Sequence, residues 1–146
     1  MKVYLDTCSL QRPLDSKTQI RIILEAESVL GILAWCERGL LELIASDALL
    51  FEIERNPNLA RQEFALEALT HASAFVELDT RVEGRARELQ NHGIKPLDAL
   101  HLACAETANT DYFCTCDDEL LRKARQIPNL QTQVTSPLEL IAEVES

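Results

Sequence analysis

The sequence predicts an α/β protein, a three-layer α/β/α sandwich around a mostly parallel five-stranded sheet. Short apolar runs of strand length alternate along the chain with longer helical stretches, and no internal repeat interrupts this order. Such alternation produces right-handed strand–helix–strand crossovers, which build a parallel sheet with helices on its faces. The 146 residues fit one domain, 1–146, and 47% apolar residues suffice for a sizeable core.

The longest helix is expected over Thr18–Arg38, after a loop that contains proline. Gly39 ends it, because glycine readily adopts the left-handed conformation that closes helices. Its buried stripe is expected to comprise Ile22, Ile23, Ala26, Val29, Leu30, Leu33 and Ala34. The expected strands are Lys2–Asp6, Leu41–Ala45, Phe75–Leu78, Asp111–Cys116 and Gln133–Thr135.

Capping residues and prolines mark the shorter helices. Ser, Thr and Asp side chains cap helix starts, and proline is tolerated in the first turn. One expected helix begins at Ser46 or Asp47 and ends at Arg55, and the next follows Asn56-Pro57 and ends near Ala72. A third begins at Asp79 or Thr80 and ends at Gly93, and a fourth begins at Pro96. The last two cover Asp117–Gln126 and Pro137–Val144.

The net charge is −10, from 14 basic and 24 acidic residues. This disfavours tight, non-specific binding to nucleic acid, which relies on basic surface, but it leaves room for a local basic rim around an acidic metal centre. Charges interrupt the N-terminus before any signal-peptide core, and they also interrupt the apolar region Ile20–Trp35. We therefore expect a cytoplasmic protein that does not contact membranes.

Five cysteines are expected to be reduced thiols, because their number is odd and no secretion signal is visible. Cys114-Thr115-Cys116 lacks the paired CxxC or histidine motif of a zinc site. Structural thiols are therefore preferred to a metal or redox role. The five are Cys8, Cys36, Cys104, Cys114 and Cys116.

Two aspartates stand where predicted strands end. Asp6 ends the first apolar run, and Asp117 follows the fourth. In parallel α/β sheets the ligand crevice lies outside the carboxyl ends of the strands, so both carboxylates should face it. Asp98 lies in a helix that is apolar almost all round, where a carboxylate needs a partner. That partner is either a cation or, more simply, the positive end of the helix dipole.

Glu52 also stands among apolar neighbours, whereas Glu54 should point elsewhere on the helix. From the pattern alone, Glu52 is equally well explained as a surface residue. A set of oxygen-only ligands suits a hard cation such as Mg²⁺ or Mn²⁺ rather than zinc. Such an ion activates water and neutralises phosphate charge, which is the chemistry of phosphodiester hydrolysis.

Four segments of the chain resemble the motifs of PIN domains, especially VapC-type toxin ribonucleases. They are Leu5-Asp6-Thr7, Ser46 through Glu52, Leu97-Asp98-Ala99-Leu100-His101-Leu102-Ala103, and Thr115-Cys116-Asp117. The resemblance covers nearly the whole chain and implies a parallel sheet of order 3-2-1-4-5. It implies a metal-dependent endoribonuclease, the toxin of a type II toxin–antitoxin pair, with RNA as substrate, a small antitoxin protein as partner and a homodimeric state.

By the same resemblance, Asp6, Glu52, Asp98 and Asp117 are expected to be catalytic and to bind Mg²⁺ or Mn²⁺, and Thr115 to supply an accessory catalytic hydroxyl. One residue departs from the family, because many members carry Asn where this chain has Cys8. Loss of that amide affects the orientation of the ligands more than metal binding itself. Asp118, next to Asp117, is expected to cap the following helix.

The residues that flank these motifs are less informative. His101, three residues after Asp98, is expected to be a core histidine bonded to a neighbour, with a general-base role as the alternative. Arg12, Lys17, Arg21 and Lys95 flank the Asp6 and Asp98 motifs, and of these Arg12, Lys17 and Lys95 are the candidates for binding RNA phosphates. Ordinary solvated loop charge explains them equally well. Trp35 is expected in the core.

Two other functions compete with a nuclease. A haloacid-dehalogenase-like phosphatase also begins with an aspartate after the first strand, but it needs a second aspartate where Cys8 stands. A PIN-like interaction module with an idle site would explain the negative net charge. The presence of all four acids favours the nuclease.

Overall fold

The computed structural model describes residues 1–146, in which five strands form one sheet of order β3-β2-β1-β4-β5. All four neighbouring pairs are parallel, and Tyr4 of the central strand pairs with Phe113. The strands are β1 (Lys2–Leu5), β2 (Glu42–Ser46), β3 (Ala72–Val76), β4 (Tyr112–Cys114) and β5 (Gln133–Thr135). The expected fold class and strand order are confirmed.

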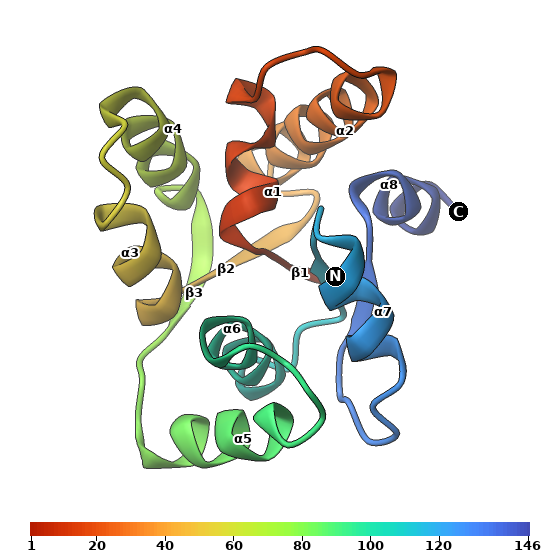
Figure 1. Ribbon diagram of the computed structural model, residues 1–146. Helices are drawn as coiled ribbons and strands as arrows, with labels where there is room; N and C mark the ends of the chain where they lie inside the picture. Colours follow the sequence, from red (N-terminus) through yellow and green to blue (C-terminus); the bar gives the residue numbers. More distant parts are fainter.

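Helices cover both sides of this sheet, with α2 and α8 on one side and α5 and α6 on the other (Figure 1). None of the helices is long and apolar enough to cross a membrane. The helices are α1 (Thr7–Gln11), α2 (Ile20–Glu37), α3 (Asp47–Glu54), α4 (Leu59–Leu69), α5 (Thr80–Gln90), α6 (Pro96–Thr107), α7 (Asp118–Arg125) and α8 (Pro137–Glu145), with a 3-10 turn η1 (Arg12–Leu14).

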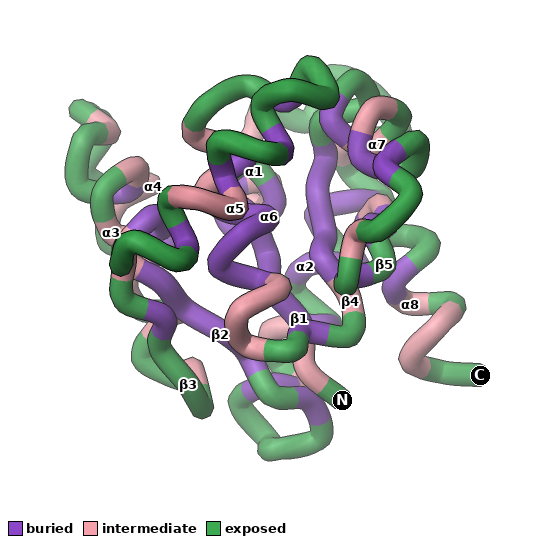
Figure 2. Tube along the Cα trace, turned by 90° about the horizontal axis from the view of Figure 1, so that it is seen from below, coloured by how far each residue is buried: buried purple, intermediate pink, exposed green.

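The core is centred on β1 and α6. Buried chain runs through the central strands and α6, whereas β3 lies exposed at the edge (Figure 2). The ring of Tyr4 stacks on that of Phe113 with centroids 5.3 Å apart. Helix α6 buries residues on nearly every side, as its apolar sequence predicted, because it packs between the sheet and α5. The elements that carry the site therefore belong to the most deeply buried part of the molecule.

Two expectations about the N-terminal third were wrong. The expected loop after Asp6 forms α1 and η1, because the Asp6 side chain accepts a hydrogen bond from the Ser9 N–H and so caps a helix. On α2, three residues of the expected stripe, Ile23, Leu30 and Ala34, are exposed. Glu25 is buried instead, because Arg12 and Arg21 both pair with its carboxylate. Trp35 is only partly buried, although it packs against the core.

Leu102 on α6 provides a test of this core. Leu102→Ala should lower the free energy of unfolding by about 2–5 kcal/mol, because it removes buried methyl groups and leaves a cavity. Leu59→Ala is the matched control, since Leu59 is 65% exposed, and it should change stability by less than about 0.5 kcal/mol. Urea denaturation of both variants measures the difference, and equal losses would contradict the placement of α6.

Candidate active site

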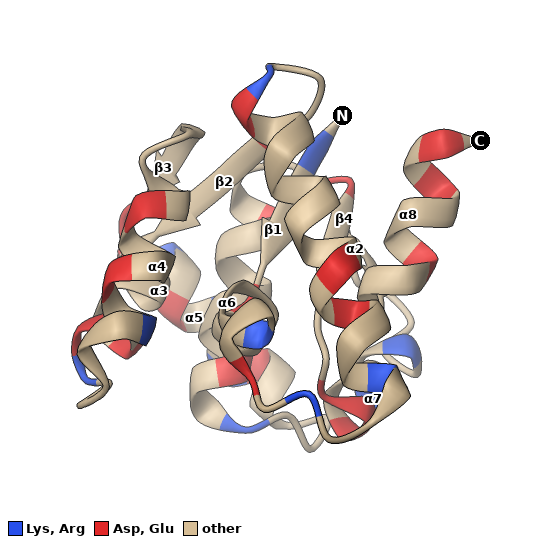
Figure 3. Cartoon of the chain, turned by 90° about the horizontal axis from the view of Figure 1, so that it is seen from above, with Lys and Arg blue, Asp and Glu red and all other residues tan.

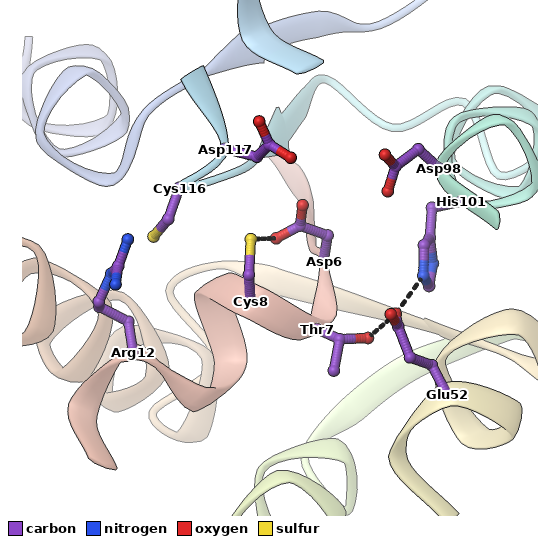
Figure 4. A pocket seen from close by; sticks show the side chains of 9 residues that line it. All are labelled: Asp6, Thr7, Cys8, Arg12, Glu52, Asp98, His101, Cys116 and Asp117. Atoms are coloured by element: carbon purple, nitrogen blue, oxygen red, sulfur yellow. Dashed lines mark hydrogen bonds and ion pairs between the residues drawn. The ribbon is translucent and has the colours of Figure 1, made fainter. Parts of the chain in front are cut away.

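Four acidic side chains from four different elements line one cavity of about 330 Å³ (Figure 4). Asp6 follows β1, Glu52 belongs to α3, Asp98 to α6, and Asp117 precedes α7. The structure therefore brings together the four acids that the sequence singled out. The other lining residues are Thr7, Cys8, Arg12, His101 and Cys116.

Asp6 is the most deeply buried of the four, with 4% of its surface exposed. Its Oδ1 accepts hydrogen bonds from the Ser9 N–H and the Cys8 thiol, each at 3.1 Å. Burial raises the pKa of Asp6, and the Thr115 hydroxyl and the Cys8 thiol oppose that shift by hydrogen bonding to the charged form. The Cys8 thiol thus donates a hydrogen bond to Asp6, as the N–H of an amide side chain at this position could.

Asp117 caps α7 with one of its two oxygens. Oδ1 accepts hydrogen bonds from the backbone N–H groups of Glu119 and Leu120, at 2.9 and 3.2 Å. The Asp117 N–H in turn donates to the hydroxyl of the buried Thr115, at 3.1 Å. The expectation that Asp118 caps this helix was wrong, because its carboxylate pairs with Arg21 at 2.6 Å.

Asp98 is the acid without a protein partner. It lies in the first turn of α6, but its carboxylate makes no hydrogen bond or ion pair. Burial raises its pKa from 3.8 to about 6, with further contributions from the charges of Asp6 and Asp117, while His101 opposes the shift. The helix dipole alone therefore leaves much of its charge uncompensated, and a cation would supply what the protein does not.

Glu52 is held in place by two hydrogen bonds to a single oxygen. Its Oε1 accepts from the Thr7 hydroxyl and from His101 Nε2, the latter at 2.8 Å (Figure 4). Burial pushes its pKa up, but the hydrogen bonds from His101 and Thr7 outweigh this and lower the pKa overall. His101 is 1% exposed and is, as expected, a core histidine bonded to its neighbours. Glu54 is exposed and does not line the cavity.

The basic candidates differ in how far their charges are already paired. Arg12 lines the cavity but contacts Asp15 and Glu25, and the Lys17 ammonium donates to two backbone carbonyls. Lys95 is exposed at the start of α6, and its ammonium makes no hydrogen bond or ion pair. It borders a small recess that it shares with Asp98 and Asp117. Lys and Arg are scattered along the chain rather than gathered on one face (Figure 3).

A sequence model of the PIN domain matches residues 3–126, most of the chain and all four acids. The chain belongs to the PIN domain family. PIN domains are generally nucleases that use divalent metal ions. No curated protein matches this PIN domain in sequence.

Two solved structures share the fold of this PIN domain. VapBC2 from Rickettsia felis, bound to a DNA fragment from its promoter, superposes with a TM-score of 0.62 and 14% identity, covering 93% of this chain and 98% of that one. PAE2754 from Pyrobaculum aerophilum gives a TM-score of 0.56 and 15% identity, covering 99% and 90%. At such low identity these likenesses show the fold alone.

The donors of this PIN domain fit a hard divalent ion of the family's kind. All four acids offer carboxylate oxygens, and both oxygens of Asp98 and one oxygen each of Asp6, Asp117 and Glu52 have no partner with hydrogen-bond geometry. No group of three or more acidic, histidine or cysteine side chains is arranged to hold an ion unaided. This arrangement suits Mg²⁺, which keeps several waters and usually binds one or two carboxylates together with substrate phosphates.

Several contacts at this site lay beyond sequence reasoning. The bond between His101 and Glu52 joins residues 49 positions apart. The buried Glu25, which ties η1 to α2, looked like an ordinary helix charge. A weak signal was present for His101, because its spacing from Asp98 puts both on one face of a helix.

Asp98 predicts an unusual dependence of stability on pH. A folded-state pKa raised to about 6 means that its stabilising effect is present in acid and is lost as pH rises through that value, so the ionised carboxylate destabilises the metal-free protein near neutrality. Asp98→Asn should therefore melt higher than wild type in EDTA at pH 7–8. The advantage should shrink between pH 6 and pH 4, where wild-type Asp98 takes up its proton.

Adding Mn²⁺ should reverse the order of the two melting temperatures. Wild type should gain about 2.7 kcal/mol at a hundredfold excess over Kd, and Asp98→Asn should gain less. Thermal melts in EDTA and in Mn²⁺ measure both effects. An Asp98→Asn variant that melts lower in EDTA, with a wild type indifferent to Mn²⁺, would show that Asp98 is a structural acid.

Proposed function

We propose that this protein is a metal-dependent endoribonuclease that hydrolyses RNA phosphodiester bonds and acts as the toxin of a type II toxin–antitoxin pair. The observation that carries the proposal is the unpartnered Asp98 in a cavity shared with Asp6, Glu52 and Asp117. Carboxylates gathered at such cost in desolvation are typical of a site that binds a cation.

The residues that line the cavity would have different roles in the reaction. Asp98 and the free oxygens of Asp6, Asp117 and Glu52 would hold Mg²⁺ or Mn²⁺ directly or through its waters. When bound, the ion neutralises phosphate charge and lowers the pKa of a water that attacks phosphorus. Thr115 orients Asp117 through its N–H and approaches the Cys8 thiol at 3.6 Å.

The assignment as a toxin is supported by the likeness to VapBC2, a protein whose name pairs a toxin with its antitoxin. By the resemblance of its motifs to VapC-type PIN domains, the partner would be a small antitoxin protein and the toxin a cytoplasmic homodimer. An idle PIN-like module, the competing function, would bind partners without cleaving RNA.

Cleavage assays on purified protein separate these two functions. Wild type should cut labelled, structured RNA with Mg²⁺ or Mn²⁺ and stop in EDTA. Asp6→Asn and Asp98→Asn should each lose at least about a hundredfold in kcat, because each removes charge that faces the ion. Glu54→Gln is the matched control and should cut at the wild-type rate, since Glu54 is exposed outside the cavity. Undiminished cleavage by Asp6→Asn and Asp98→Asn would overturn the proposal.

Lys95 is the basic residue best placed to hold an RNA phosphate. In an Asp6→Asn background that does not cleave, Lys95→Ala should weaken RNA binding and lower the slope of log K against log salt by about one. Lys17→Ala should change the slope less, because the Lys17 ammonium is already bonded to two carbonyls. Fluorescence anisotropy at several salt concentrations measures both slopes. The reverse order would place the phosphate near η1 rather than α6.

A further inference from the structure

Behind the cavity, buried polar side chains form an unbroken chain of hydrogen bonds. Ser46 Oγ lies 2.7 Å from the Tyr4 hydroxyl, which lies 2.7 Å from His101 Nδ1. His101 Nε2 then lies 2.8 Å from Glu52 Oε1. Ser46, Tyr4 and His101 are each at most 1% exposed. The chain thus links β2, β1, α6 and α3 inside the core and ends at the cavity.

The groups at the two ends of this series of hydrogen bonds determine which atom donates in each bond. The Leu49 N–H donates to Ser46 Oγ at 3.1 Å, because Ser46 caps α3. At the other end, the Glu52 carboxylate can only accept, so His101 Nε2 donates to it. In a neutral ring Nδ1 then accepts the Tyr4 proton, and the Tyr4 oxygen accepts the Ser46 proton. A ring nitrogen that accepts a hydrogen bond carries no proton, so the proton of neutral His101 is on Nε2, where it donates to Glu52.

The reverse direction is disfavoured by the lack of a good acceptor. It would require His101 Nδ1 to donate to Tyr4 and Tyr4 to donate to Ser46, leaving the Ser46 proton to find another partner. Ser46 Oγ makes hydrogen bonds with the Leu49 N–H and the Tyr4 hydroxyl, and the sulfur of the neighbouring Cys104 would be a weak acceptor. His101 Nε2 would also face the Glu52 oxygen without a proton unless the ring were charged.

We propose that His101 is a positioning residue for the cleavage reaction proposed above, on which this inference rests. Held as the Nε2–H tautomer, it fixes Glu52 with Oε1 occupied and Oε2 free. The Thr7 hydroxyl donates to the same Oε1, whereas Oε2 has no hydrogen-bond partner. Glu52 therefore presents one defined oxygen to an ion or its water.

The same chain also places Asp98. His101 and Asp98 lie one turn apart on α6, so the bond from Tyr4 that anchors the ring also fixes the helix that carries Asp98. Tyr4 is immobilised in turn by stacking on Phe113. Hydrogen-bond partners behind metal ligands typically account for 10–100-fold in metal affinity or activity.

Nuclear magnetic resonance on the metal-free wild type tests the tautomer without any assay of activity. The ¹⁵N shifts of the His101 ring, assigned by comparison with His101→Gln, should show a protonated Nε2 and a bare Nδ1 at neutral pH. A protonated Nδ1, or a doubly protonated ring, would overturn the inference. The protonation state is read from unaltered protein, and the His101→Gln spectrum serves only to identify which ring signal is missing.

Two variants test the positioning role. His101→Leu fills the core site but cannot donate to Glu52, and it should weaken Mn²⁺ binding by calorimetry and lower kcat about 10–100-fold with KM for RNA unchanged. His101→Gln places an amide N–H near the position of Nε2 and should recover most of both quantities. A residue needed only for packing would give the opposite order, because leucine packs better than glutamine in a core.

The outcomes separate this inference from the proposed function. If wild type binds Mn²⁺, His101→Leu binds it weakly and no RNA is cut, the ribonuclease assignment fails while Glu52 positioning stands. If wild type cuts RNA and a folded His101→Leu matches it in kcat and Mn²⁺ affinity, the positioning role fails alone.

Discussion

The fold is arranged around a buried carboxylate at the carboxyl end of its central strand. Removing Asp6 from water costs free energy, and the protein offsets that cost locally with the Ser9 N–H, the Cys8 thiol and the Thr115 hydroxyl. The Ser9 N–H bond is also the cap that starts α1, so the segment after β1 is a helix instead of a loop. These donors do not extend to Asp98, and this difference between a compensated and an uncompensated acid marks the cavity as functional rather than merely structural.

The two arginines beside the cavity wall, Arg12 and Arg21, are already paired with acidic side chains. These ion pairs connect neighbouring elements of the fold. Glu25, buried in α2, binds Arg12 and Arg21, and Arg21 reaches Asp118 at the start of α7. This network joins η1, α2 and α7 around one side of the cavity, so its charges stabilise the wall rather than attract phosphate. Lys95, exposed at the start of α6, is left without an ion pair beside the recess that it shares with Asp98 and Asp117.

Sequence reasoning recovered the features that follow from local pattern. The fold class, the five strands and the placement of Asp6 and Asp117 follow from alternating apolar runs that end in acids. Strand β5, Gln133–Thr135, was predicted at its observed bounds, but the face of α2 was misjudged. A buried glutamate is invisible to hydrophobic periodicity, because the arginines that make its burial tolerable come partly from another element. Glu52 was ambiguous for the same reason, since its partners Thr7 and His101 are distant in sequence.

Cys8 shows how such a site tolerates a change in its supporting residues. Its thiol donates to the same Asp6 oxygen that the Ser9 N–H already serves, and it approaches the Thr115 hydroxyl. A thiol is a weaker donor than an amide, so Asp6 depends here more on the backbone of α1 and on Thr115 than it would with asparagine at that position. The backbone contact cannot be lost by side-chain substitution, provided that α1 remains folded. The orientation of the central carboxylate is therefore secured by a helix cap, which explains how the chain can differ from its family at this residue and still keep the geometry of the cavity.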